Sequence, residues 1–220
     1  MDEIWRDPTV GEIAARTLLI SGVATLAAML VGVPLGYALG RGRFRGQTFL
    51  FASVNTGMGM PPVVVGLVVW LLLVRSGPFG GLELVYTKTA MALAQFLIAV
   101  PIVVGFTAAS IEALPPLLPD LLHVLGAGRL LRMWLIARQA RLGLLAGVMA
   151  AFGGVVSEVG ASMTVGGNLQ GQTRVLTTAI VTETSRGNVG RALALGAVLL
   201  VLAFASNLGL TLIQQRRRAA

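Results

Sequence analysis

The sequence has no cysteine and only one histidine, His123, among its 220 residues. Without cysteine the chain can form neither a disulfide bond nor a thiolate metal site. A lone histidine excludes a histidine-cluster metal site, and the pattern around it does not indicate a serine–histidine triad. We therefore expect no metal site, no cofactor and no catalytic residues in this chain.

Charge is scarce as well. Charged residues make up 12% of the chain and hydrophobic residues 55%, whereas a soluble domain carries about 25% charged residues. The hydrophobic residues fall in long uncharged blocks, and a helix needs about 20 apolar residues to cross the hydrocarbon core of a bilayer. The composition leaves no room for a separate soluble domain and predicts an all-α, polytopic membrane helix bundle that occupies 1–220 as one domain.

The uncharged blocks predict about five transmembrane helices. The fourth block contains one acid, Glu158, before it continues through small residues. The segment 112–141, between the third and fourth blocks, is too polar to span. The predicted spans cover about 17–40, 48–74, 89–111, 142–165 and 192–214.

Ten of the seventeen basic residues follow the first, third and fifth predicted spans, accompanied only by Glu112 and Asp120. Cytoplasmic loops are enriched in lysine and arginine, so we expect these segments and the C-terminus in the cytoplasm and the N-terminus outside. The basic residues do not gather on one polar face, as nucleic-acid binding requires. The expected surroundings are therefore the lipid bilayer of the plasma (inner) membrane and not nucleic acid. The ten are Arg41, Arg43, Arg45, Arg129, Arg132, Arg138, Arg141, Arg216, Arg217 and Arg218.

The second predicted span is interrupted near its middle by glycines and by the pair Pro61 and Pro62. Prolines remove backbone donors, and broken backbone in a bilayer is tolerated where protein or a water-lined cavity satisfies the freed carbonyls. Two interpretations remain open: a stretch that faces a pathway, or a kink used only for packing.

Glu158 is the one acid within a predicted span. A charged residue at the centre of a membrane helix costs about 2.5–3.5 kcal/mol. At about 1.5 Å per residue, Glu158 lies roughly 25 Å from Arg141, which places it near the outer interface. We therefore favour a structural role, as an ion pair or at a helix end, over direct participation in a pathway.

The segment 112–141 carries leucines and a tryptophan at helical spacing, interrupted by Gly126, Ala127 and Gly128. This pattern predicts two short amphipathic helices joined at a glycine bend. The helices could lie on the membrane surface with their arginines in the headgroup region, or they could receive a cytoplasmic partner. The threonine-rich stretch 172–186 predicts a short external helix, which is either a plain connector or a docking element.

Asp120, Leu121, Leu122, Gly126 and Ile136 together resemble the cytoplasmic EAA loop of ABC-importer permeases. That pattern has an acid and two alanines, a glycine four residues after the second alanine, and an isoleucine after nine more residues. The spacing is the same here, although leucines replace the two alanines and the later Leu-Pro of the family is absent.

Further stretches are similar to the permeases of oxyanion importers, and most of all to the tungstate branch. Molybdate and sulfate permeases share the Pro-Pro stretch and the Glu-x-Gly-Ala segment, so the resemblance points to the family more strongly than to one substrate. The resemblance covers the chain from about Arg16 to Gln214. The stretches are 33–37, 60–67, 157–161, 166–168 and 173–180.

The resemblance implies a type I importer. Two copies of the permease would form a central path, two separate ABC ATPase subunits would dock on the cytoplasmic loops, and an external solute-binding protein would deliver the oxyanion. ATP chemistry would belong to the ATPase, because this chain contains no G-x-x-x-x-G-K-[ST] phosphate loop.

The candidate sites form three groups and one structural acid, Glu158. Hydroxyl and amide groups are included in the path because they can pass a tetrahedral dianion without binding it tightly. ATPase coupling is assigned to Asp120, Leu121, Leu122, Gly126, Ala127 and Ile136; the path to Asn55, Thr56, Pro61, Pro62, Ser157 and Thr164; and the binding-protein side to Gly166, Gly167, Asn168, Thr173 and Arg174.

Three alternatives compete with a tungstate permease. The first is a molybdate or sulfate permease of the same build. The second is an ion-coupled secondary transporter, which ordinarily needs ionisable residues near the midplane of the membrane. The third is a membrane enzyme acting on lipid phosphates, which needs a cluster of acids, histidines or basic residues that this chain lacks.

Overall fold

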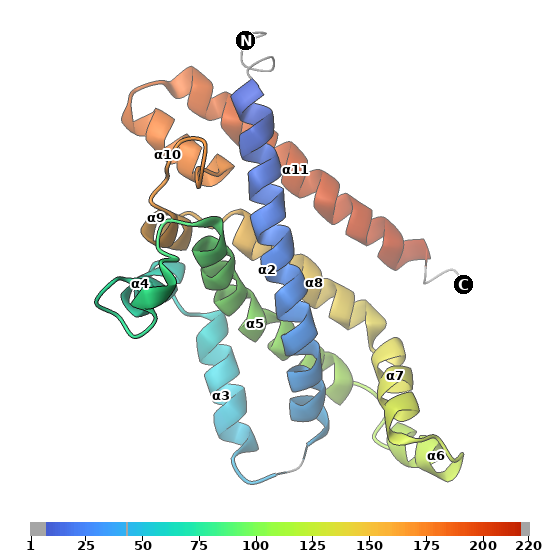
Figure 1. The fold of residues 1–220 in the computed structure, drawn as a ribbon. Coiled ribbons are helices and arrows are strands. Elements are labelled where there is room, and N and C mark those ends of the chain that lie inside the picture. The colour runs from blue at the N-terminus through green and yellow to red at the C-terminus, as the bar shows by residue number, and fades with distance from the viewer. Residues whose placement is uncertain (1–7, 43, 217–220) are drawn as a thin grey trace.

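The computed structural model describes residues 8–42 and 44–216, and within these ranges the regular elements are helices (Figure 1). Three helices are long and apolar enough to cross a membrane, or up to five if each of two bent helix pairs counts as one span. The long helices are α2 (Pro8–Arg41), α5 (Lys88–Glu112) and α11 (Val189–Arg216).

The first bent pair is α3 (Gln47–Met58) and α4 (Pro62–Leu73), which meet at 99°. Pro61 precedes α4 and Pro62 opens it, a position that suits proline because the first turn of a helix needs no N–H donor there. The interruption expected in the second span is therefore a sharp bend between two helices.

The second bent pair is α7 (Arg129–Gln139) and α8 (Arg141–Val156), which meet at 70°. The sequence predicted one span over 142–165, but α8 ends at Val156 and a short helix, α9 (Gly160–Gly166), follows. The break lies at Glu158, whose carboxylate accepts a hydrogen bond from the N–H of Ala161 in the first turn of α9 (3.1 Å). The side chain thus satisfies one backbone N–H at the start of a separate helix, where the sequence predicted that one span would continue.

Helix α5 is central to the core and packs closely along α2. The approach depends on glycine: a Cβ atom built on Gly36 would lie 2.6 Å from the Cβ of Thr107. At Gly32 it would lie 2.8 Å from Cγ1 of Val103. Both distances are shorter than real Cβ contacts, so any larger residue would push the two helices apart.

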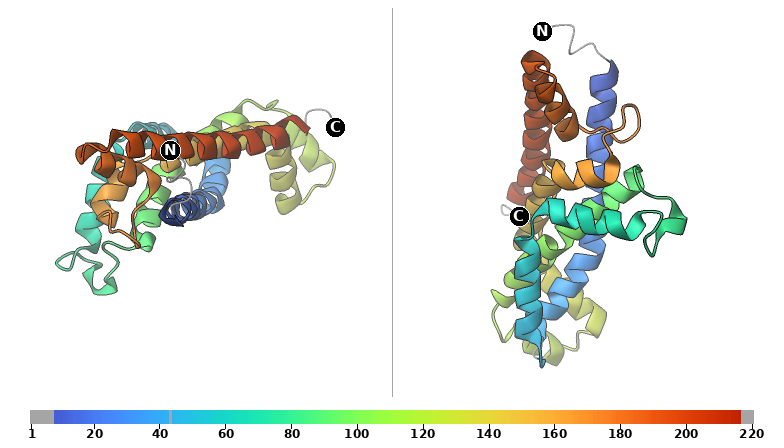
Figure 2. Two further views of the ribbon diagram at one scale, coloured as in Figure 1. Left: turned by 90° about the horizontal axis from the view of Figure 1, so that it is seen from above. Right: turned by 90° about the vertical axis from the view of Figure 1, so that its left-hand side faces the viewer.

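Two groups of connections lie at opposite ends of the molecule (Figures 1 and 2). One end holds the α2–α3 turn together with α6 (Leu118–Val124) and α7. The other end holds the start of α2, the helix α10 (Leu176–Ser185) and the start of α11. A 3₁₀ turn, η1 (Gly80–Leu82), lies in the connection from α4 to α5.

Candidate functional site

The bend between α6 and α7 is a hydrogen-bonded helix ending. The N–H of Gly126 donates to the carbonyl of His123, and the N–H of Ala127 donates to that of Leu122, both at 3.0 Å. These two bonds form a Schellman motif, which needs a left-handed residue after the helix, and Gly126 has φ +78°. Glycine is therefore the residue that allows the chain to reverse here.

The base of this segment is buried in a cluster around Ile136, which we call the coupling root. Ile136 is 1% exposed and packs in a cluster with Ile111 of α5 and Ala140. Tyr37 of α2 and Leu122 of α6 are partly buried against the same cluster. The segment is thus seated on α2 and α5 at its base and is not a loose loop.

The tip of the segment is apolar and exposed. Val124 is 83% exposed, Leu125 72% and Leu130 83%. We call these three residues the coupling tip. None of the three was among the predicted coupling residues. Of those that were, Leu121 is exposed, and Asp120 is exposed and lines a cleft of about 660 Å³ with Arg41 and Glu112. The structure therefore divides the predicted set into a buried root and an exposed surface.

The predicted path residues lie around the two helix breaks. Asn55 and Thr56 are exposed near the end of α3, where the hydroxyl of Thr56 donates to the carbonyl of Ala52 (2.8 Å). Ser157 is exposed at the end of α8 and donates to the carbonyl of Gly153 (2.8 Å). These hydroxyl protons are held within their own helices, and the hydroxyl oxygens keep their acceptor capacity.

The two breaks adjoin each other through α4 and α9. A Cβ atom on Gly66 would lie 2.6 Å from the Cα of Ala161, and one on Gly160 would meet the side chain of Val63. The structure thus brings the Pro61–Pro62 break next to the break at Glu158. Thr164, on α9, is partly buried and donates to the carbonyl of Gly160 (2.9 Å).

The loop 167–175, which the sequence predicts to lie outside and which we call the external loop for that reason, is held by buried polar contacts. Thr173 is 1% exposed; its hydroxyl donates to the carbonyl of Gly166 and accepts the N–H of Leu169 (2.9 Å). Gly166 is also buried, against Met91. Two of the residues assigned to the binding-protein side therefore hold the loop in shape from within.

Hydrogen bonds of Arg174 and Asn168 connect the loop to α10. Nε of Arg174 donates to Oδ1 of Asn168 (3.2 Å), and Nδ2 of Asn168 donates to the hydroxyl of Thr182 (2.6 Å). Gly167 and Asn168 both have positive φ, +65° and +52°. Gly167 is exposed, while Asn168 and Arg174 are half-buried.

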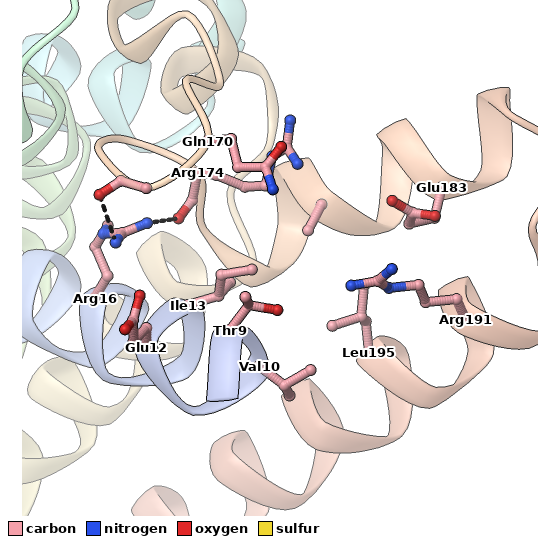
Figure 3. Close-up of a pocket in the computed structure, with 12 residues that line it drawn as sticks. Thr9, Val10, Glu12, Ile13, Arg16, Gln170, Arg174, Glu183, Arg191 and Leu195 are labelled. Carbon is pink, nitrogen blue, oxygen red and sulfur yellow. Dashed lines mark hydrogen bonds between the residues drawn. The ribbon is translucent and has the colours of Figure 1, made fainter. Parts of the chain in front are cut away.

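Sequence reasoning missed two residues of α2 that hold this loop, Arg16 and Thr17. Nη1 and Nη2 of Arg16 donate to the carbonyls of Arg174 (2.9 Å) and Gly171 (3.0 Å), as Figure 3 shows. The hydroxyl of Thr17 accepts the N–H of Leu176 (3.0 Å). The only sequence signal was an arginine at the start of an apolar block, which also fits a simple interfacial anchor.

Comparison with known proteins places the chain in a family. Residues 32–219 match the family described as "Binding-protein-dependent transport system inner membrane component". A probable anion ABC transporter permease protein of Haloferax volcanii is 39% identical, and the match covers 89% of this chain and 86% of that protein. The tungstate uptake system permease protein TupB of Peptoclostridium acidaminophilum is 40% identical, covering 91% of this chain and 88% of that protein.

The fold is also that of a solved transporter. The crystal structure of an amino acid ABC transporter with histidines matches with a TM-score of 0.70 at 17% sequence identity, over 98% of this chain and 97% of the other. The family match covers most of the chain and the relatives are similar along nearly their whole length. The chain belongs to the family of binding-protein-dependent transport system inner membrane components.

Proposed function

We propose that this chain is the permease subunit of an ATP-driven importer of a tetrahedral oxyanion, with tungstate as its substrate. Two copies form the central path, two ABC ATPase subunits dock on the cytoplasmic side, and an external solute-binding protein delivers the anion. The similarity over nearly the whole chain to a permease named for tungstate uptake supports this substrate. As a member of its family the chain is a transport subunit and not an enzyme, and the proposal assigns it no cofactor.

The orientation proposed has the N-terminus outside and the C-terminus in the cytoplasm. Arg41 and Arg45, on either side of the α2–α3 turn, lie at the same end of the molecule as α7 with its arginines, which supports a cytoplasmic location for that end (Figure 1). The absence of cysteine allows a direct test. A membrane-impermeant thiol reagent should label Val124→Cys only from the cytoplasmic side and Gln170→Cys only from outside; the reverse pattern would overturn the orientation.

The observation that carries the coupling role is an exposed apolar tip on a buried root. An apolar surface of this kind is unfavourable in water and is typical of a site that docks a partner. Closure of the ATPase pair would move the tip, and the root at Ile136 would pass the movement to α5 and α2. Asp120, Leu121, Gly126 and Ala127 lie beside the tip and would complete the docking surface, whereas Leu122 belongs to the root.

The path proposed runs along the adjoining helix breaks. Asn55, Thr56, Ser157 and Thr164 would offer amide and hydroxyl groups, and Pro61 and Pro62 would keep the backbone bent. The hydrogen bond from the N–H of Ala161 to Glu158 supports a structural role for this acid. That role fits an anion path, because an ionised carboxylate facing the path would repel the substrate.

Uptake by the assembled importer tests the whole proposal. The permease, its ATPase and the loaded binding protein are reconstituted in proteoliposomes, and internal tungstate is measured with ATP supplied. We expect tungstate uptake to need ATP hydrolysis. Uptake of molybdate or sulfate, each supplied with its cognate binding protein, should be slower. Uptake that persists without ATP and collapses with the proton gradient would instead indicate a secondary transporter.

The substrate branch and the transporter class fail in different ways. Preferred uptake of molybdate or sulfate would remove the tungstate assignment and leave the importer intact. An ATPase variant that binds but does not hydrolyse ATP is the matched control, and it should abolish uptake of every oxyanion.

A further inference from the structure

Arg16 is a buried cation that fastens the outer end of α2 to the external loop. Its side chain bonds the carbonyls of Gly171 and Arg174, which lie 155 and 158 residues away in the sequence. The residue is 9% exposed. Removing a guanidinium from water is costly unless it is well hydrogen-bonded, and two backbone carbonyls fix both its position and that of the loop.

The contacts of Arg16 continue through the loop. Arg174, whose carbonyl Arg16 holds, donates from its own side chain to Asn168, and Asn168 donates to Thr182 of α10. Next to Arg16, Thr17 accepts the N–H of Leu176 at the start of α10. Arg16 and Arg174 line one side of a pocket of about 180 Å³, and Glu183 and Arg191 line its opposite side (Figure 3).

The other end of α2 reaches the root of the coupling segment. Tyr37 packs against the cluster that contains Ile136, and the glycines of α2 bring it into close contact with α5. Arg16 and Tyr37 are 21 positions apart, so they are separated by about 30 Å along the helix. That distance equals the thickness of the hydrocarbon core, so α2 joins the two faces of the membrane.

We propose that Arg16 holds the external loop in the conformation that the binding protein recognises, and that α2 links this loop to the coupling root. Arg16 is thereby a positioning residue for the response of ATP hydrolysis to a docked binding protein. The inference rests on the proposed function, because it needs a binding protein outside and an ATPase inside.

The experiment measures ATP hydrolysis by the full importer in lipid nanodiscs as tungstate-loaded binding protein is added. For Arg16→Gln we expect the concentration giving half-maximal stimulation to rise about tenfold, since a hydrogen bond to a charged group contributes roughly 1.4 kcal/mol or more. Arg16→Lys should respond like Arg16→Gln, because an ammonium is a point charge that does not span two carbonyls as a guanidinium does.

Arg75→Gln is the matched control. Arg75 is an exposed arginine in the connection after α4, on the same proposed side of the membrane, and its replacement removes the same charge. It should respond to the binding protein as the wild type does. Recovery of the wild-type response in Arg16→Lys would show that charge alone matters and would overturn the proposal.

A second variant, Thr17→Val, covers the case in which Arg16→Gln does not assemble. It removes the acceptor for the N–H of Leu176 and should shift the half-maximal concentration in the same direction by a smaller factor. An unchanged response in Thr17→Val and Arg16→Gln, with normal stimulation of the wild type, overturns this inference alone. A wild-type importer that tungstate-loaded binding protein fails to stimulate overturns the proposed function instead.

Discussion

The α6–α7 bend and the external loop 167–175 are both chain reversals that contain a glycine with positive φ, yet their chemistry is opposite. At the bend, Gly126 has φ +78° and the neighbouring side chains are apolar and exposed. In the loop, Gly171 has φ +76° and the side chain of Thr173 is polar and buried.

The difference shows where each connection obtains its stability. Buried polar groups that find partners within the chain give the external loop a fixed shape before anything binds. The exposed apolar tip has no such internal satisfaction and gains free energy when a partner covers it. The external loop is therefore a preformed surface, whereas the coupling tip would be completed by the partner that we propose for it.

The largest effect is expected at the root on which the tip depends. Ile136→Ala should lower the free energy of unfolding by about 2–5 kcal/mol, because it removes a fully buried aliphatic side chain and leaves a cavity. Thermal unfolding in detergent measures the loss. Leu130→Ala, at an 83% exposed position of the adjacent tip, is the control and should change stability little. Equal losses in the two variants would mean that the segment is not seated through Ile136.

The external loop should be destabilised by the loss of one buried hydroxyl, whereas the loss of an exposed hydroxyl on α10 should matter little. Thr173→Val keeps the shape of the side chain but leaves the N–H of Leu169 without its acceptor, at about 1–3 kcal/mol. Thr184→Val is the control, since Thr184 is exposed and its hydroxyl donates to the carbonyl of Ile180 in its own helix. If both threonines tolerate valine equally, the loop is not held by its polar interior.

The end of the molecule that holds α6 and α7 could be predicted because its signals are local. The apolar spacing of 112–141 and the glycines at its centre predicted two short helices, and the structure confirms α6 and α7. Pro61 and Pro62 likewise predicted an interruption of the second span, which the 99° bend confirms. Helical periodicity and helix-breaking residues act over a few positions, so one sequence is enough to reveal them.

The contacts that hold the loop 167–175 could not be predicted, because they are long-range. The hydrogen bonds of Arg16 join positions more than 150 residues apart, and no spacing in the sequence reports them. The end of α8 was missed for a different, local reason. Apolar content predicted one helix over 142–165, whereas the helix breaks at Glu158, whose carboxylate accepts the N–H of Ala161, three positions further on, in the first turn of a separate α9.

Substitutions of Glu158 should have an intermediate effect on stability. They test whether its side chain is needed as a hydrogen-bond acceptor or as a negative charge. Glu158→Ala removes the acceptor of the N–H of Ala161 and should cost about 0.5–2 kcal/mol, the range measured for side-chain helix caps. Glu158→Gln keeps an acceptor oxygen and should lose less, with tungstate uptake preserved. A glutamine variant as unstable as the alanine variant would show that the negative charge, and not the cap, is what the site requires.

The smallest effect on stability is expected at the coupling tip, where the effect on assembly should be large. Val124→Ser changes a side chain that is 83% exposed, so the free energy of unfolding should stay within about 0.5 kcal/mol of the wild type. Co-purification with the ATPase should nevertheless weaken, because a hydroxyl replaces the apolar contact that the partner would cover. The control is Val181→Ser, an exposed valine of α10 at the opposite end, which should leave assembly unchanged. If Val124→Ser assembles with the ATPase as the wild type does, the docking surface does not include the coupling tip. The contrast between a preformed external loop and a coupling tip that needs its partner would then no longer hold.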